Sequence, residues 1–169
     1  MKLKHLTFSA MMAASSAVLM FLSTAIPFFE LTLSAAAGLC PLAAMLYGKS
    51  RRAGLLTWAC ASVLGLVLFA GRQAPVLYLC IFGLYPTLKS LCETQRHRKL
   101  SFLLKLLSAN AGFWASVLLF YLIFPAILES YNGVLLPMAV TFNVFFLLYD
   151  FFLTRVAMRL AVMISRMKQ

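Results

Sequence analysis

The sequence predicts an all-α, polytopic membrane protein in which six transmembrane helices form one bundle. Of its 169 residues, 63% are hydrophobic and only 11% are charged. A soluble domain is usually about 45–50% apolar and about 25% charged, so this chain has too few polar side chains to cover a water-exposed surface. Its apolar stretches also lack the alternating pattern of membrane β-strands. The short connections between the stretches predict a single integral membrane domain over 1–169.

The positions of the basic residues predict the orientation. If the apolar stretches are spans, every one of the 15 Lys and Arg residues except Arg72 falls on the same side. Lys and Arg resist translocation, so we expect that side, and both termini with it, to be cytoplasmic. Topology therefore explains the net charge of +11 without a nucleic-acid partner. The expected partner of the basic face is the lipid bilayer, including its anionic lipids.

The first three helices are predicted over 6–28, 31–47 and 53–70. The first apolar run can cross about 30 Å of hydrocarbon and exceeds the core of a signal peptide, so we expect it to be retained. Cleavage near the small residues Ser23-Thr24-Ala25 is the alternative. Topology does not decide between them, because the other five helices would keep their orientation. The second run is short for a span and is expected to stand upright.

The last three helices are predicted over 75–92, 102–128 and 134–163. Within the first of these, Pro86 removes a backbone donor and clashes with the preceding turn, so we expect a kink near Gly83 and Pro86. Such a kink either borders a cavity or hinge or is an ordinary feature of a membrane helix. The last two helices exceed the length of a span and should tilt or project from the membrane.

Asp150 is predicted to form an ion pair at membrane depth. An Asp near the centre of a membrane helix costs about 2.5–3.5 kcal/mol on insertion scales. At 1.5 Å per residue, Lys89 and Lys105 reach a similar depth on the fourth and fifth helices. We therefore expect Asp150 to pair with Lys89, Lys105 or Arg155, with Glu93 in the same network. The network is either a structural tie or a coupling or proton-relay group.

Small residues recur every four positions along the first helix, at Ser9, Ala10, Ala13, Ala14 and Ala17. Small side chains let helices approach closely in lipid, where packing drives association. One hypothesis is packing against a neighbouring helix of the same chain. The other is a docking face for a second membrane protein.

Further polar residues have two interpretations each. Asn110 and Asn143 lie within spans, where amides usually tie helices together, and a ligand contact is the alternative. The residues expected at the outer rim either form a ligand mouth or sit in water at turns: Glu30, Arg72, Gln73, Glu129, Tyr131 and Asn132.

Catalytic and metal-binding motifs are absent from the sequence. It has no HExxH, GxSxG or phosphate-binding loop, and Asp150 has no acidic partner cluster. The four Cys form no CxxC pair, so neither a zinc site nor a disulfide framework is indicated. We therefore expect no enzyme activity, no metal and no cofactor.

A basic six-helix chain of this size, with an alanine stripe on its first helix, resembles the substrate-binding S components of energy-coupling factor (ECF) transporters. In that family an Ala-x-x-x-Ala stripe docks on a membrane coupling subunit, and the pairs Ala10/Ala14 and Ala13/Ala17 match this spacing. The stretches around 83–93 and 149–155 are similar to those of small six-helix membrane proteins of Gram-positive bacteria. The resemblance thus implies the cytoplasmic membrane of a bacterium. The short second helix and the lack of a vitamin-recognition signature depart from the family pattern.

Two functions follow from these observations. The first is a small-solute or vitamin uptake subunit that captures its ligand from the outer side and relies on an ATP-driven partner. The second is an accessory or scaffold membrane protein of cell-envelope assembly, without a ligand. A polar outer cavity would favour the first, and a tightly packed bundle would favour the second.

Overall fold

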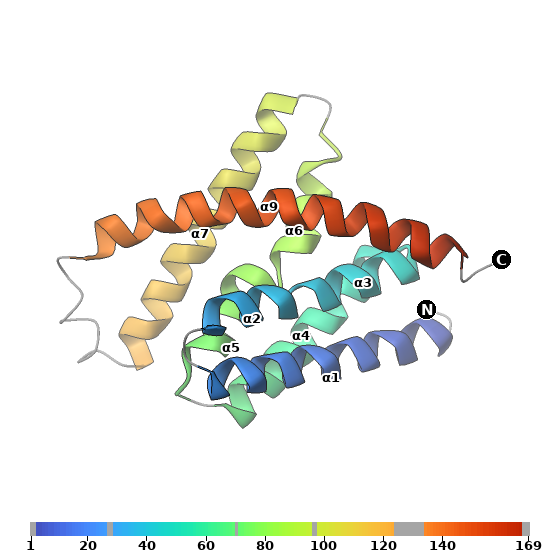
Figure 1. Cartoon of the computed structure of the whole chain (residues 1–169), viewed down its shortest axis with the longest axis horizontal. Coiled ribbons are helices and arrows are strands. Elements are labelled where there is room, and N and C mark those ends of the chain that lie inside the picture. The colour runs from blue at the N-terminus through green and yellow to red at the C-terminus, as the bar shows by residue number, and fades with distance from the viewer. Residues whose placement is uncertain (1–2, 27–28, 70, 96–97, 124–133, 167–169) are drawn as a thin grey trace.

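The computed structural model describes residues 3–26, 29–69, 71–95, 98–123 and 134–166, and these ranges contain helices and turns but no strand. The elements in order are α1 (Leu3–Ala25), α2 (Glu30–Ala37), α3 (Leu39–Gly48), α4 (Arg51–Leu68), α5 (Gln73–Leu77), the π-helix η2 (Tyr78–Phe82), α6 (Tyr85–Cys92), α7 (Arg98–Ile123) and α9 (Leu135–Arg166) (Figure 1).

Six helical segments of this part of the chain are long and apolar enough to cross a membrane. Two of them are composite: α2 and α3 join at Gly38, and α5, η2 and α6 together make Gln73–Cys92. The all-helical, six-span part of the prediction is confirmed. The architecture is consistent with a multi-pass membrane protein in contact with lipid.

The helix ends differ in places from the predicted ends. α7 begins at Arg98 rather than at residue 102, so part of the expected basic loop is helical. Arg, Lys and Leu are strong helix formers, which accounts for this extension. The predicted end of the fifth helix at residue 128 lies outside the described residues. α9 continues to Arg166, and its 32 residues make a helix about 48 Å long at 1.5 Å per residue.

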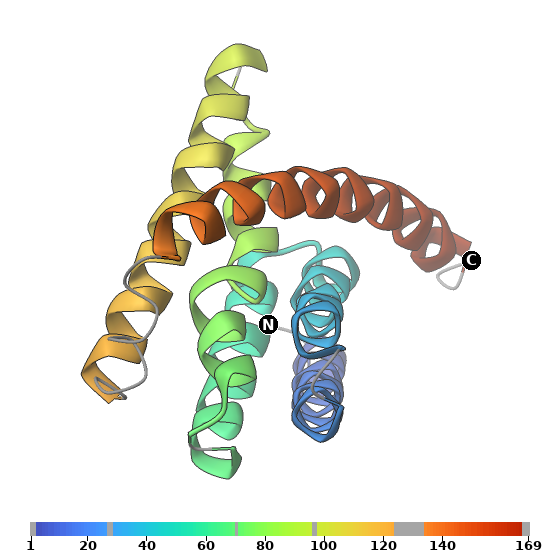
Figure 2. The same cartoon turned by 60° about the vertical axis from the view of Figure 1, so that its left-hand side comes forward.

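The composite segment Gln73–Cys92 occupies the centre of the molecule. In its most apolar stretch 61% of the residues are buried, against 17% in the stretch of α9. Figures 1 and 2 show α9 crossing α6 and α7 instead of running alongside them. The short connections in the sequence predict antiparallel packing of successive spans, and the last two spans depart from that prediction because they cross.

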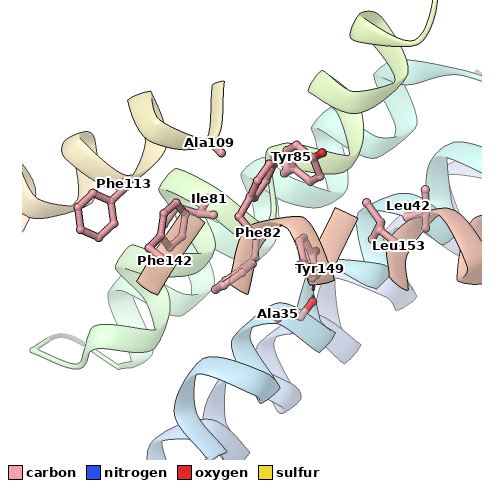
Figure 3. Close-up of a cluster of buried hydrophobic side chains, with 11 residues drawn as sticks. Ala35, Leu42, Ile81, Phe82, Tyr85, Ala109, Phe113, Phe142, Tyr149 and Leu153 are labelled. Atoms are coloured by element: carbon pink, nitrogen blue, oxygen red, sulfur yellow. Dashed lines mark hydrogen bonds between the residues drawn. The ribbon is translucent and has the colours of Figure 1, made fainter. Parts of the chain in front are cut away.

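Aromatic side chains fill the larger core, where the central segment meets α7 and α9 (Figure 3). The ring of Tyr85 lies edge-on to Phe146, with the ring centres 4.8 Å apart. The rings of Phe113 and Phe142 stack at 4.9 Å. Tyr149 donates a hydrogen bond of 3.4 Å to the carbonyl of Ala35. A second, smaller core joins α1 and α4 to the central segment.

Candidate functional site: a buried charge cluster

Lys89 and Asp150 form the centre of a charge cluster between α6 and α9. The Lys89 residue is only 4% exposed, and its ammonium forms an ion pair with Oδ1 of Asp150. The same Nζ donates to the Asp150 carbonyl at 2.9 Å and to Oγ1 of Thr154 at 2.6 Å. All three donors of the ammonium therefore have acceptors, as burial of a charge requires.

Asp150 has partners on both carboxylate oxygens. The hydroxyl of Tyr85 donates to Oδ1 at 2.6 Å, and Nζ of Lys105 lies 3.6 Å from Oδ2. Asp150 therefore bridges α6 and α7 from its place on α9. The carboxylate is compensated by two cations and one hydroxyl.

Glu93 closes the cluster on its more exposed side. Its Oε1 lies 2.7 Å from Nζ of Lys105 and 3.7 Å from Nζ of Lys89. The Glu93 side chain is 47% exposed, whereas that of Lys89 is 5% exposed, so the cluster runs from the interior to the surface. Two Lys and two carboxylates make its net charge zero. Beside it, Arg51 donates to Oγ1 of Thr94 at 2.7 Å and so ties α4 to the end of α6.

Arg155, the third predicted partner of Asp150, lies outside this cluster. Its guanidinium sits over the ring of Phe151, 5.0 Å from the ring centre. Five residues at 3.6 per turn leave Arg155 and Asp150 about 140° apart around the helix axis, so both cannot face α6. Depth along a helix, on which the prediction rested, does not give the direction of a side chain around the helix axis.

Tyr85 and Thr154 also belong to the cluster but were not predicted from the sequence. Their spacing was a signal in the sequence: Tyr85 lies four residues before Lys89, and Thr154 lies four residues after Asp150. Residues four apart share one helix face. A search for hydroxyls at that spacing from Lys89 and Asp150 would have found them.

The cluster has the features of a structural tie. Its charges balance, it links α6, α7 and α9, and its most buried ammonium has acceptors for every donor. The described residues contain no group of three or more His, Cys, Asp or Glu placed to hold a metal ion.

The central helix is broken at the predicted kink. Gly83 N donates to the carbonyl of Tyr78 at 2.8 Å, five residues back, which is the π-helical pattern. The carbonyl of Leu79 accepts a 3.0 Å bond from the indole Nε1 of Trp58 on α4. A neighbouring helix thus satisfies a backbone group within the irregular segment, as the apolar environment demands.

Asn110 and Asn143 bond to each other across α7 and α9. Each Nδ2 donates to the other residue's Oδ1, at 2.9 and 3.1 Å. Each also donates to the carbonyl four residues earlier in its own helix. Both NH₂ groups and both amide oxygens are therefore used within the protein, which favours the interpretation as a tie over that as a ligand contact.

The small-residue stripe of α1 is divided between two faces. Ser9 and Ala13 are each 4% exposed, and the carbonyl of Ser9 accepts a bond from Thr57 on α4. These two residues pack inside the chain, so they are not available to a partner. Ala17 is half-buried, whereas Ala10 and Ala14 are exposed.

The described residues of the predicted rim, Glu30, Arg72 and Gln73, line neither the hollow beside α2 nor the one on the last part of α9. Glu30 accepts a 3.1 Å bond from the backbone N of Ala74, at the start of α5. Arg72 is exposed in the preceding turn. Glu129, Tyr131 and Asn132 lie outside the described residues. A hollow of about 360 Å³ does lie between α2, α3 and α9, and it is lined mainly by Ala, Leu and Phe side chains.

No protein family, curated protein or solved structure matches this chain.

Proposed function

We propose that this protein is a non-catalytic subunit of a larger membrane assembly, which it joins through the exposed face of α1. The observation that carries the proposal is the exposure of Ala10 and Ala14 on a helix whose opposite face is already packed. Two exposed alanines four residues apart allow a second helix to approach closely in lipid.

In its specific form, the assembly is an uptake transporter and this chain is its S-component-like, solute-binding subunit. The pair Ala10/Ala14 has the spacing of the docking stripe in that family. The hollow between α2, α3 and α9 is the candidate ligand position, and its apolar lining suits a small solute with an apolar surface. ATP hydrolysis would come from the coupling partner.

The proposed orientation places both termini in the cytoplasm of a bacterial cell. It is supported by the basic residues at one set of helix ends, including Lys49 between α3 and α4 and Arg51 at the start of α4. Cysteine labelling in intact cells tests this orientation. All native Cys are replaced, and a single Cys is placed at residue 72 or at residue 52. We expect a membrane-impermeant reagent to label the Cys at residue 72 and not the Cys at residue 52.

The docking proposal is tested by affinity purification from native membranes in mild detergent, with mass spectrometry of the bound proteins. The test variant is Ala10→Leu with Ala14→Leu. The control is Ala111→Leu with Ala115→Leu, which changes two exposed alanines at the same spacing on α7. We expect a coupling subunit with ATPases to be recovered with the wild type and the control and lost with the test variant. Equal recovery with the test variant would overturn the docking face.

The second candidate function is an accessory or scaffold protein without a ligand. It is favoured by the Asn110–Asn143 pair and by the bond from Ala74 to Glu30, which use polar groups that a ligand would need. Recovery of envelope-assembly proteins without ATPases, again lost with the test variant, would select this function.

A further inference from the structure

The last part of α9 carries exposed arginines with apolar side chains between them. Arg159 and Arg166 are exposed on the same side of the helix, two turns apart. Met158, Val162 and Met163 lie among them and are 54%, 53% and 61% exposed. These five residues line a shallow hollow of about 400 Å³.

The carboxylates of the described acidic residues bind partners away from this segment. Glu93 and Asp150 form all four ion pairs of the described part of the chain, with Lys89 and Lys105. Glu30 accepts a bond from the start of α5. Arg159 and Arg166 therefore have no carboxylate partner among the described residues. Insertion explains why such cations lie at one set of helix ends, but it supplies no counter-anion.

The length of α9 places this segment near the membrane surface. The helix is about 48 Å long, whereas the hydrocarbon core is about 30 Å thick. Asp150, which lies among buried aromatic side chains, is nine residues before Arg159. Figures 1 and 2 show the C-terminal end of α9 extending beyond α3, and the arginine face of this segment is exposed, whereas Ile164 on another face is buried.

We propose that Arg159 and Arg166 bind the headgroup phosphate of an anionic phospholipid, whose acyl chain covers the apolar residues between them. A guanidinium binds phosphate oxygens through paired N–H donors. The exposed Met and Val side chains suit an acyl chain, whereas a nucleic acid or an acidic protein segment in water would leave them uncovered. The site is separate from α1, so it does not depend on the proposed docking function.

The test uses the full chain in mild detergent with equal amounts of phosphatidylglycerol and phosphatidylcholine, and counts bound lipids by native mass spectrometry. We expect a preference for phosphatidylglycerol that weakens with added salt. Arg159→Gln with Arg166→Gln should lower the preference by about fivefold per arginine, which corresponds to about 1 kcal/mol each. The matched control is Arg72→Gln, an exposed arginine before α5, and it should leave the preference unchanged.

Two further measurements keep the test decisive. Unchanged thermal unfolding of the double Gln variant in phosphatidylcholine alone would show that its fold is intact, as expected for exposed positions. The Lys variants at both positions should keep most of the preference, because the charge remains. Equal binding of the two lipids by the wild type or an unchanged preference in the double Gln variant would overturn the proposal. So would displacement of the lipid by inorganic phosphate or an oligonucleotide beyond that caused by sodium chloride at the same ionic strength.

Discussion

The central segment Gln73–Cys92 and the last helix α9 are held in place in different ways. The central segment is enclosed, and its backbone meets other helices directly: Trp58 bonds to the carbonyl of Leu79. α9 has far fewer buried residues: one face packs aromatic side chains into the larger core, and the charge cluster at Asp150 and the amide pair at Asn143 add polar contacts. Close packing on most sides therefore fixes the first, while one packed face and a few polar contacts fix the second.

One polar residue can therefore matter more at the edge of this protein than at its centre. In a membrane, apolar side chains gain little free energy by exchanging lipid acyl chains for protein contacts. Helix association therefore depends on packing and on polar contacts. A helix that packs sparsely must depend on the polar contacts. The three predictions below test this division.

The largest effect is expected at the attachment of α9. Asp150→Leu leaves the ammonium of Lys89 buried without its carboxylate, and breaking a buried ion pair costs about 3–5 kcal/mol. Thermal unfolding in detergent measures the loss of stability. It is monitored by the reaction of a thiol dye with the buried Cys40 and Cys92, which unfolding exposes.

The double variant Lys89→Met with Asp150→Leu should recover much of that loss, because no unpaired charge at position 89 remains. Arg155→Gln is the control, since this exposed arginine lies over Phe151 and outside the cluster. If Asp150→Leu unfolds at the temperature of the wild type, the charge cluster does not hold α9.

A smaller effect is expected at the packing of the central segment. A Cβ added at Gly38 would lie 2.4 Å from the backbone oxygen of Phe82, so the two helices must separate in Gly38→Ala. Overpacking of this kind costs about 1–3 kcal/mol. Gly48→Ala is the milder control, because its new Cβ would meet the Cβ of Ala53 at 3.1 Å. Equal unfolding temperatures for the two variants would argue against close packing as the main constraint.

The smallest effect is expected at the amide pair between α7 and α9. A double-mutant cycle of Asn110→Ala and Asn143→Ala should give a coupling energy of about 0.6 kcal/mol, and at most about 1.7 kcal/mol. The same unfolding assay measures the two single variants and the double variant. Strictly additive losses would mean that the two amides contribute independently and do not tie the helices.

Position along each helix was enough to predict some members of the charge cluster but not all of them. Counting residues along each helix placed Lys89, Lys105 and Asp150 at one level, and these three residues do meet. The same counting admitted Arg155, which points elsewhere because it lies on another side of α9. The stripe on α1 shows the same limit, since Ala13 and Ala14 differ by one residue and lie on different faces.

Some contacts between helices could not be predicted from the sequence at all. Pro86 predicted a kink, but neither the π-helical turn nor the Trp58 bond to the Leu79 carbonyl followed from it. The close approach of Gly38 to Phe82 joins residues 44 positions apart. Such contacts depend on which helices become neighbours, and a single sequence does not state this.

The helical class, the number of apolar spans and the level of the polar residues along them could be predicted from the sequence alone. These properties depend on local composition and on the constant rise of a helix. The folded arrangement was needed to show which helix lies at the centre, how α9 crosses the others, and whether a small or charged residue is buried. These properties depend on the rotation and packing of helices far apart in sequence, because the lipid-facing and protein-facing sides of a span are equally apolar.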